Sequence, residues 1–172
     1  MEFVFLFATT FFLSLSRKSP LLRKYFIGNT GCSVYLFGEP AIAETTRTKD
    51  NDVMHVVKCF SGPISYGVIC IDLHNPFVNG AEAGKTLVNF MNSLHQPFSI
   101  LHQTGMEEKT VNDGDLTITD YWQDKGNRDW KVKGWTNGQV VAVLFVSNIS
   151  EMAVCNQDRF LESLSCTARK LA

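Results

Sequence analysis

Three strand-like segments follow one another between residues 115 and 147, and they constrain the fold more than any other part of the chain. They are 115–123, 129–136 and 139–147, and only short turns containing Gly126 and Asn137-Gly138 separate them. Strands joined by short turns pair antiparallel, because a parallel pair needs a long crossover connection. This stretch therefore predicts an antiparallel β-meander.

The alternation of apolar and polar residues sets the register of this meander. A turn of odd length around Gly126 places Trp122 opposite Trp130 and Asp120 opposite Val132. An even length would place apolar side chains beside lysines, which wastes burial. The favoured register puts on one face Leu116, Ile118, Asp120, Trp122, Trp130, Val132, Val141, Val143 and Phe145. It puts on the other face Thr117, Thr119, Tyr121, Lys131, Lys133, Trp135, Val140, Ala142 and Leu144.

The turn at Asn137-Gly138 has the composition of a two-residue type I′ hairpin. Such a turn places Trp135 opposite Val140 and Trp130 opposite Phe145. The segment 139–147 is apolar on both faces, so we expect it to be covered on both sides of the sheet.

The remaining segments alternate strand and helix patterns. Residues 53–60 and 64–73 predict a hairpin around a Ser-Gly-Pro turn, and 98–103 predicts a short strand. Helices are expected over 81–94, with Asn79 as cap and Glu82 three residues on, and over 157–170. The second helix has Asn156 as cap, and one of its faces carries Phe160, Leu161, Leu164 and Ala168. The predicted fold class is α+β, a mostly antiparallel sheet of about six strands with helices packed on it, similar to an α/β/α sandwich.

Length and charge exclude several classes of protein. A chain of 172 residues has room for one domain, and 45% hydrophobic with 19% charged residues is typical of a globular protein. The net charge of −1 gives no electrostatic basis for binding nucleic acid. We therefore predict a single globular domain without a nucleic-acid partner.

The N-terminal region, residues 1–43, has the composition of a signal or anchor segment. It contains the apolar run Phe3–Leu15, basic residues, a second apolar stretch and the triplet Ala41-Ile42-Ala43, which suits a signal peptidase. Cleavage after Ala43, an uncleaved anchor and a buried N-terminal helix remain three alternatives. The first predicts a flexible leader at 44–52 and one α+β domain over 53–172. The expected location is outside the cytoplasm (periplasm, lumen or extracellular space), with membrane attachment only through the N-terminal segment.

Four cysteines would remain after that cleavage: Cys59, Cys70, Cys155 and Cys166. They allow up to two disulfides with three connectivities, and the alternative is that they are buried free thiols. We expect Cys59 and Cys70 on adjacent strands, and Cys155 and Cys166 in or beside the last helix. Their spacing does not match a redox or zinc motif.

The search for catalytic motifs yields no site. Gly80 to Thr86 ends in Gly-Lys-Thr, but a phosphate-binding loop needs four residues between its glycines and only three are present. The four histidines are scattered, and no arrangement of nucleophile and base stands out. We therefore assign no catalytic, cofactor-binding or metal-binding residue, and expect no cofactor.

A ligand or interaction surface is predicted instead in the aromatic and charged segment 120–138. Its candidate residues are Asp120, Tyr121, Trp122, Trp130 and Trp135. Asp120 is the unusual member, because the pattern points it inward, where a carboxylate must be hydrogen-bonded or protonated. It either accepts bonds from a backbone N–H, an indole or a lysine, or it forms the polar floor of a tryptophan-lined cleft.

The tail DGDLTITDYW…DWKVKGWTNGQVVAVLFV…RFLESLSC resembles the second half of proteins of the PsbP/Mog1-like fold, and the likeness extends over about the last two-thirds of the chain. The matching positions are Gly114, Tyr121, Asn137, Gly138 and Leu164, and the helix 81–94 stands where that family has its first long helix. The family's tyrosine pair is replaced by Asp120-Tyr121-Trp122. The resemblance implies an exported, non-catalytic binding or accessory protein with a protein partner or small ligand. The alternatives are an unrecognised hydrolase or other enzyme, and a membrane-anchored structural protein.

Overall fold

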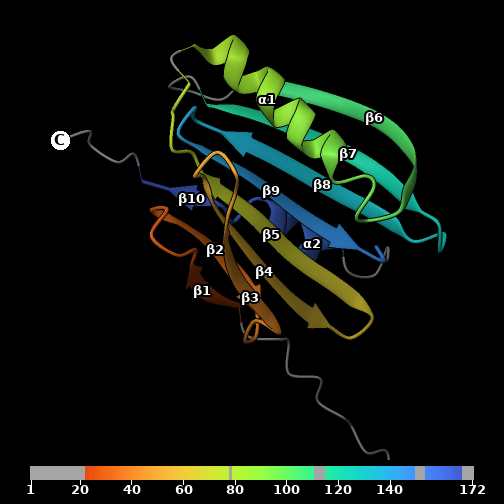
Figure 1. The fold of residues 1–172 in the computed structure, drawn as a ribbon. Coiled ribbons are helices and arrows are strands. Elements are labelled where there is room, and N and C mark those ends of the chain that lie inside the picture. The colour runs from red at the N-terminus through yellow and green to blue at the C-terminus, as the bar shows by residue number, and fades with distance from the viewer. Residues whose placement is uncertain (1–21, 78, 111–114, 150–153, 168–172) are drawn as a thin grey trace, which may run out of the picture.

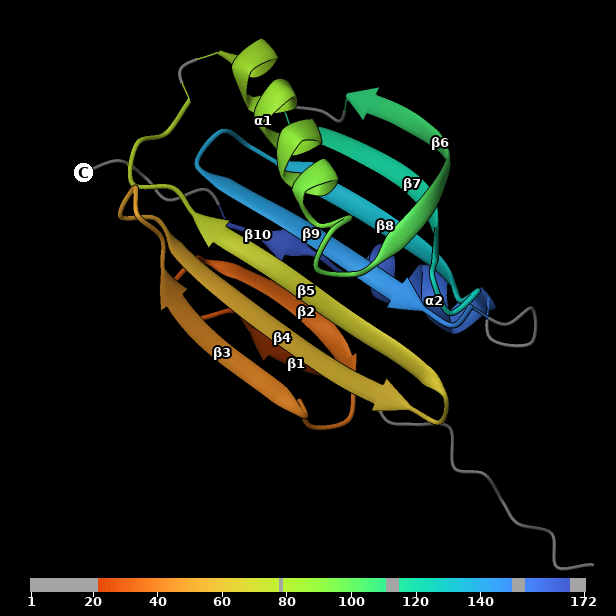
Figure 2. The same cartoon turned by 45° about the vertical axis from the view of Figure 1, so that its right-hand side comes forward.

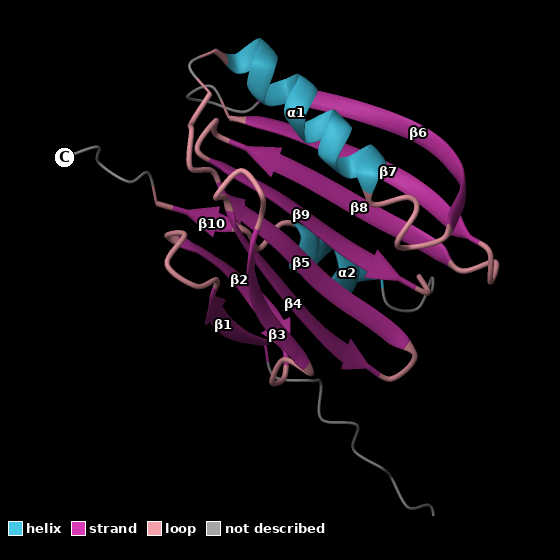
Figure 3. Ribbon diagram, viewed as in Figure 1, coloured by secondary structure: helices cyan, strands magenta, loops and turns pink. Residues whose placement is uncertain are grey.

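The computed structural model describes residues 22–77, 79–110, 115–149 and 154–167, and these form two stacked antiparallel sheets with two helices (Figure 1, Figure 3). The large sheet has the strand order β3-β4-β5-β9-β8-β7-β6. Its strands are β3 Ile42–Arg47, β4 Val53–Ser61, β5 Ile64–Asp72, β6 Ile100–Thr110, β7 Leu116–Asp124, β8 Asp129–Thr136 and β9 Val140–Ser147. The small sheet has the order β1-β2-β10, formed by β1 Leu22–Phe26, β2 Cys32–Phe37 and β10 Ser165–Cys166. The α+β class is confirmed, with seven strands in the main sheet where about six were expected.

The large sheet is covered on both sides, which gives two hydrophobic cores (Figure 2). Helix α1, Gly80–Ser93, packs on one side through Leu87 and Met91, and we call this the α1-side core. The small sheet and helix α2, Val154–Leu161, pack on the other side and form the α2-side core, which includes Phe160. All eight residues of β9 are buried between the two cores, as the doubly apolar pattern predicted.

The register across the Gly126 turn is confirmed. Trp122 pairs with Trp130 and Asp120 pairs with Val132. The predicted two-residue turn at Asn137-Gly138 is wrong, because Trp135 pairs with Ala142 and Trp130 with Ser147. The Asn137 side chain accepts from the N–H groups of Gln139 and Val140, at 3.0 and 2.9 Å. These bonds stabilise a longer loop, and the shift of two residues leaves every side chain on its predicted face.

The first helix begins as predicted, since the Asn79 side chain accepts from the N–H of Glu82 at 2.8 Å. The second helix is corrected: it ends at Leu161, and the chain then extends into β10. The Ser163 hydroxyl donates to the Phe160 carbonyl and also accepts from the Tyr35 N–H, which ties the end of the helix to the small sheet. The predicted helical position of Ala168 lies outside the described residues.

The division of the chain at residues 43 and 53 stays a prediction, although the structure describes strands on both sides of residue 43. Residues 22–43 were expected to be removable, and 44–52 to be a flexible leader. In the structure they contain β1, β2 and β3, and Val34 and Leu36 of β2 are buried in the α2-side core. Strand β3 is hydrogen-bonded along β4, so Ala43 lies within a strand. Proteolytic processing stays a prediction, and the proposed anchor Phe3–Leu15 lies outside the described residues.

One disulfide joins the two ends of the described chain. Cys166 is bonded to Cys32, not to one of the other candidates, and Cys59, Cys70 and Cys155 are free thiols. Cys59 and Cys70 lie on the adjacent strands β4 and β5, as expected, and Cys155 lies in α2. The partner of Cys166 was missed because Cys32 belongs to the segment that was expected to be removed.

Candidate interaction face

The sheet divides the five predicted site residues between its two sides. Asp120, Trp122 and Trp130 face the α1-side core and are 1%, 2% and 5% exposed. Tyr121 and Trp135 point to the other side, where Tyr121 is 41% exposed and Trp135 is half-buried. The structure therefore leaves two of the five side chains on an accessible face, and Tyr121 and Trp135 stand four rungs apart there.

Asp120 is fully engaged in hydrogen bonds inside the α1-side core. One carboxylate oxygen accepts from Gln103 Nε2 and from the Trp122 indole, both at 2.6 Å. The other accepts from the N–H of Tyr121 at 2.8 Å. These bonds are the ones that a buried carboxylate requires, so the geometry is that of a structural anchor for the Trp122 indole.

A second buried carboxylate, Asp124, plays the same part for Trp130. It is 1% exposed and accepts from the N–H groups of Gly126 and Arg128, from Arg128 Nε at 2.7 Å and from the Trp130 indole at 3.0 Å. Burial raises the pKa of this carboxyl, but the four hydrogen bonds outweigh it and hold the pKa below its ordinary value. Asp124 was missed from the sequence, although it stands two positions beyond Trp122 on the same face and directly before the Gly126 turn.

The accessible side is the α2-side face of β6, β7 and β8, which we call the open face. Its side chains are His102, Thr104, Glu107, Thr117, Thr119, Tyr121, Gln123, Asp129, Lys131, Lys133 and Trp135. The small sheet and α2 cover this face only in part, so its outer strands remain polar and exposed. Alternation predicted six of these residues on β7 and β8, namely Thr117, Thr119, Tyr121, Lys131, Lys133 and Trp135, but Gln123 and Asp129 were not included. The contribution of β6 was missed because only 98–103 was expected to be a strand.

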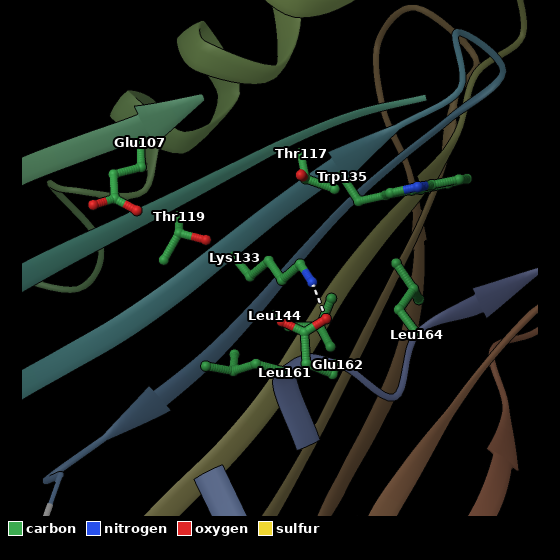
Figure 4. Close-up of a pocket in the computed structure, with 9 residues that line it drawn as sticks. All are labelled: Glu107, Thr117, Thr119, Lys133, Trp135, Leu144, Leu161, Glu162 and Leu164. Carbon is green, nitrogen blue, oxygen red and sulfur yellow. Dashed lines mark hydrogen bonds and ion pairs between the residues drawn. The ribbon is translucent and has the colours of Figure 1, made fainter. Parts of the chain in front are cut away.

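Two hollows lie on the open face. The Lys133 hollow, of about 400 Å³, is lined by Glu107, Thr117, Thr119, Lys133, Trp135, Leu144, Leu161, Glu162 and Leu164. Figure 4 shows Lys133 pointing toward Glu162, with Glu107 and Trp135 on opposite sides of it. The Tyr121 hollow, of about 410 Å³, is lined by His102, Thr104, Tyr121, Trp122, Gln123, Asp129, Trp130 and Ile149.

Between the hollows stands a rung formed by Tyr121 and Lys131. The Lys131 ammonium lies 5.6 Å from the centre of the Tyr121 ring and 2.8 Å from the Asp158 carboxylate of α2. Burial lowers the pKa of Lys131, but the hydrogen bond and charge of Asp158, together with the interaction with Tyr121, outweigh it and raise the pKa above its ordinary value. Lys133 donates in the same way to Glu162 at 2.6 Å. Both lysines of the face are therefore already paired with carboxylates, Lys131 with one in α2 and Lys133 with one directly after it.

The remaining ionisable groups do not assemble into a reactive centre within the described ranges. No group of three or more His, Cys, Asp or Glu side chains could hold a metal ion there. His55 Nδ1 is hydrogen-bonded to the Thr45 hydroxyl at 2.9 Å. Burial raises the pKa of the Cys70 thiol to about 12. A thiol with that pKa is protonated at neutral pH and is a poor nucleophile. In the same part of the chain, no helix is long and apolar enough to cross a membrane.

Comparison with known proteins gives a likeness of fold. No protein-family model matches the chain. No curated protein matches it either. Among solved structures, the chain is similar to the solution structure of cyanobacterial PsbP (CyanoP) from Synechocystis sp. PCC 6803, with 14% identity over 86% of this chain and 94% of that chain, and a TM-score of 0.48. This is a weak, fold-level resemblance, of the kind that the sequence predicted.

Proposed function

We propose that this chain is an exported, non-catalytic binding protein that contacts a protein partner or small ligand through the open face. The observation that carries the proposal is the composition of that face. It combines an exposed tyrosine, a half-buried tryptophan and charged side chains around two hollows, on the part of the sheet that neither the small sheet nor α2 fully covers. Aromatic residues with a polar surround are typical of protein interaction surfaces.

The state of the charged groups supports binding over catalysis. A catalytic acid or base is usually an ionisable group with a perturbed pKa that also reaches into a cavity. Here Asp124, the carboxyl with a lowered pKa, accepts four internal hydrogen bonds, and Lys131 donates a hydrogen bond to Asp158. These two groups stabilise the fold and are not available as a general acid or base.

The Cys32–Cys166 disulfide supports export. Disulfides persist in oxidising compartments and are rare in the cytosol, where thiols are kept reduced. Fractionation of the native host should therefore recover the chain outside the cytoplasm with this bond intact. A reduced chain in the cytosolic fraction would contradict export without touching the binding proposal.

Site-specific crosslinking tests the binding face. Tyr121 and Tyr35 are matched positions, because both are exposed tyrosines, at 41% and 44%, and Tyr35 lies on β2 of the small sheet. We expect a photoreactive phenylalanine at position 121 to form a discrete adduct in the native host, whereas the same group at position 35 does not. Identical adduct patterns from both positions, or no adduct from either, would contradict the open face as the binding surface.

A further inference from the structure

We infer that the open face binds an extended basic segment of a partner protein, with two cationic side chains four residues apart that reach the two hollows. The inference rests on the proposed function and specifies its ligand. Three features carry it: the charge of each hollow, the distance between the hollows along the strands, and the aromatic ring that separates them.

Each hollow has an excess of one negative charge among its described side chains. In the Lys133 hollow, the carboxylates of Glu107 and Glu162 stand against one ammonium, that of Lys133, so the formal balance is −1. Glu162 is the partner of Lys133, which leaves Glu107 without a cation among the described side chains. In the Tyr121 hollow, Asp129 is the only charged residue when His102 is neutral, so the balance is again −1.

Among the described side chains, the only partner of Asp129 is a neutral one. Asp129 accepts from Gln123 Nε2 at 3.1 Å, and the neighbouring Arg128 is occupied by Asp124. A carboxylate that is hydrogen-bonded to an amide, and not to a cation, retains its attraction for an incoming ammonium or guanidinium. Glu107 and Asp129 are thus two separate anionic points, one at each hollow.

The spacing of these points matches an extended peptide. Glu107 pairs with Thr119 and Asp129 with Gln123, so the two carboxylates are four residues apart as measured on β7. Four residues of strand span about 13 Å, and the two-strand offset between β6 and β8 adds about 10 Å sideways. A second extended chain places its side chains i and i+4 on one side at the same 13 Å interval, and long Lys or Arg side chains can cover the sideways offset.

The chemistry between the hollows favours the same ligand. Lys131 and Lys133 are neutralised by Asp158 and Glu162, so they do not repel a basic segment. An anionic ligand would have to displace these carboxylates, and it would meet Glu107 and Asp129 at either end. The exposed Tyr121 ring offers the middle of the peptide an apolar contact between its two cationic ends.

The test is titration calorimetry at low salt with an acetylated and amidated peptide, Lys-Thr-Val-Thr-Lys. The comparison peptides are Glu-Thr-Val-Thr-Glu and Thr-Lys-Val-Lys-Thr, which change the charge or the spacing. The test variants are Glu107→Gln and Asp129→Asn. The controls are Glu44→Gln and Asp50→Asn, which remove carboxylates that are also exposed, from β3 and its following turn.

We expect the i, i+4 dilysine peptide to bind more tightly than both comparison peptides. Each test variant should weaken it by about two- to fivefold, the effect of one exposed ion pair, and the two losses should multiply in the double variant. The control variants should change the affinity by less, and added salt should weaken binding.

Equal binding of the acidic peptide, or an affinity that the double variant leaves unchanged, would overturn the inference. Equal binding of free spermidine would also overturn it, since the ligand would then be any small polycation rather than an extended segment. If the dilysine peptide fails to bind while a crosslink at position 121 still forms, the basic ligand is contradicted but the open face remains supported as the binding surface. Failure of both experiments would remove both.

Discussion

Replacing Asp120 with asparagine tests whether the carboxylate is a structural anchor. Asparagine has nearly the same shape but only one acceptor oxygen and no charge. In its best orientation this oxygen keeps the bonds from Gln103 and Trp122, and the amide nitrogen then faces the N–H of Tyr121. The variant loses one hydrogen bond, loses the charge assistance in two others and buries two opposed donors.

The free energy of unfolding should fall by about 2–3 kcal/mol, because a hydrogen bond to a charged group contributes about 1.5–3 kcal/mol and an unsatisfied buried donor costs about as much. For a chain of 172 residues, each kcal/mol corresponds to about 2–4 °C, so the melting temperature should fall by about 4–12 °C. The assay is thermal unfolding followed by circular dichroism, with the oxidised protein throughout.

Asp50→Asn is the matched control, since Asp50 is exposed in the turn between β3 and β4. Its unfolding free energy should change by at most about 0.5 kcal/mol. If Asp120→Asn melts like the control, the carboxylate does not anchor Trp122. If the Asp120→Asn variant keeps its stability but loses crosslinking at position 121, Asp120 acts in binding and is not a structural anchor.

Three further perturbations follow from the same geometry. Because the pKa of Asp124 is lowered in the folded state, its contribution to stability is present above about pH 4, the ordinary value, and is lost as the pH falls through the folded pKa. The urea unfolding midpoints of the wild type and Asp124→Asn should therefore converge at low pH, and a constant difference between them would contradict this. Iodoacetamide at pH 8 without reductant should modify Cys155 in the native protein, while Cys70, buried with a pKa of about 12, should react only after unfolding. Mass spectrometry counts the labels, and labelling of Cys70 as fast as Cys155 would contradict the burial of Cys70. Gly134→Ala should lower the free energy of unfolding by about 1–3 kcal/mol, since the new Cβ would lie 2.6 Å from Met91 Sδ, whereas the Cβ of Gly80→Ala meets nothing within 4 Å and should not destabilise the fold. Equal melting temperatures for the two variants would contradict the close approach of α1 to β8.

The faces of β7, β8 and β9 could be predicted from the sequence because the signal is local. Leu116, Ile118 and Trp122 alternate with threonines and Tyr121, and burying the apolar set fixes which way each side chain points. The odd turn at Gly126 followed from the same reasoning. The turn at Asn137-Gly138 could not be fixed in this way, because a shift of two residues preserves the faces and only the side-chain bonds of Asn137 select the longer loop.

The part of the fold before residue 53 could not be predicted, because its stabilisation is non-local. Strand β2 gains its partners from β1 and from β10, which lies 132 residues further along the chain at the Ser33–Ser165 pair. A buried strand and the apolar region of a signal peptide have similar compositions, so residues 25–37 suit both. The disulfide between Cys32 and Cys166 depends on the same pairing and was therefore missed with it.

The density of aromatic and acidic residues in this chain has a structural reason. A tryptophan in the interior of a sheet buries an indole N–H that needs an acceptor. All three tryptophans find a carboxylate: Trp122 donates to Asp120, Trp130 to Asp124 and Trp135 to Asp115. These aspartates accept hydrogen bonds from the indoles inside the fold, so their presence in the sequence says little about ligands. The side chains available for the proposed partner are those that alternation sends to the other face, above all Tyr121, Glu107 and Asp129. Which face a residue occupies, rather than how many aromatic and charged residues a segment holds, therefore decides which of them can bind.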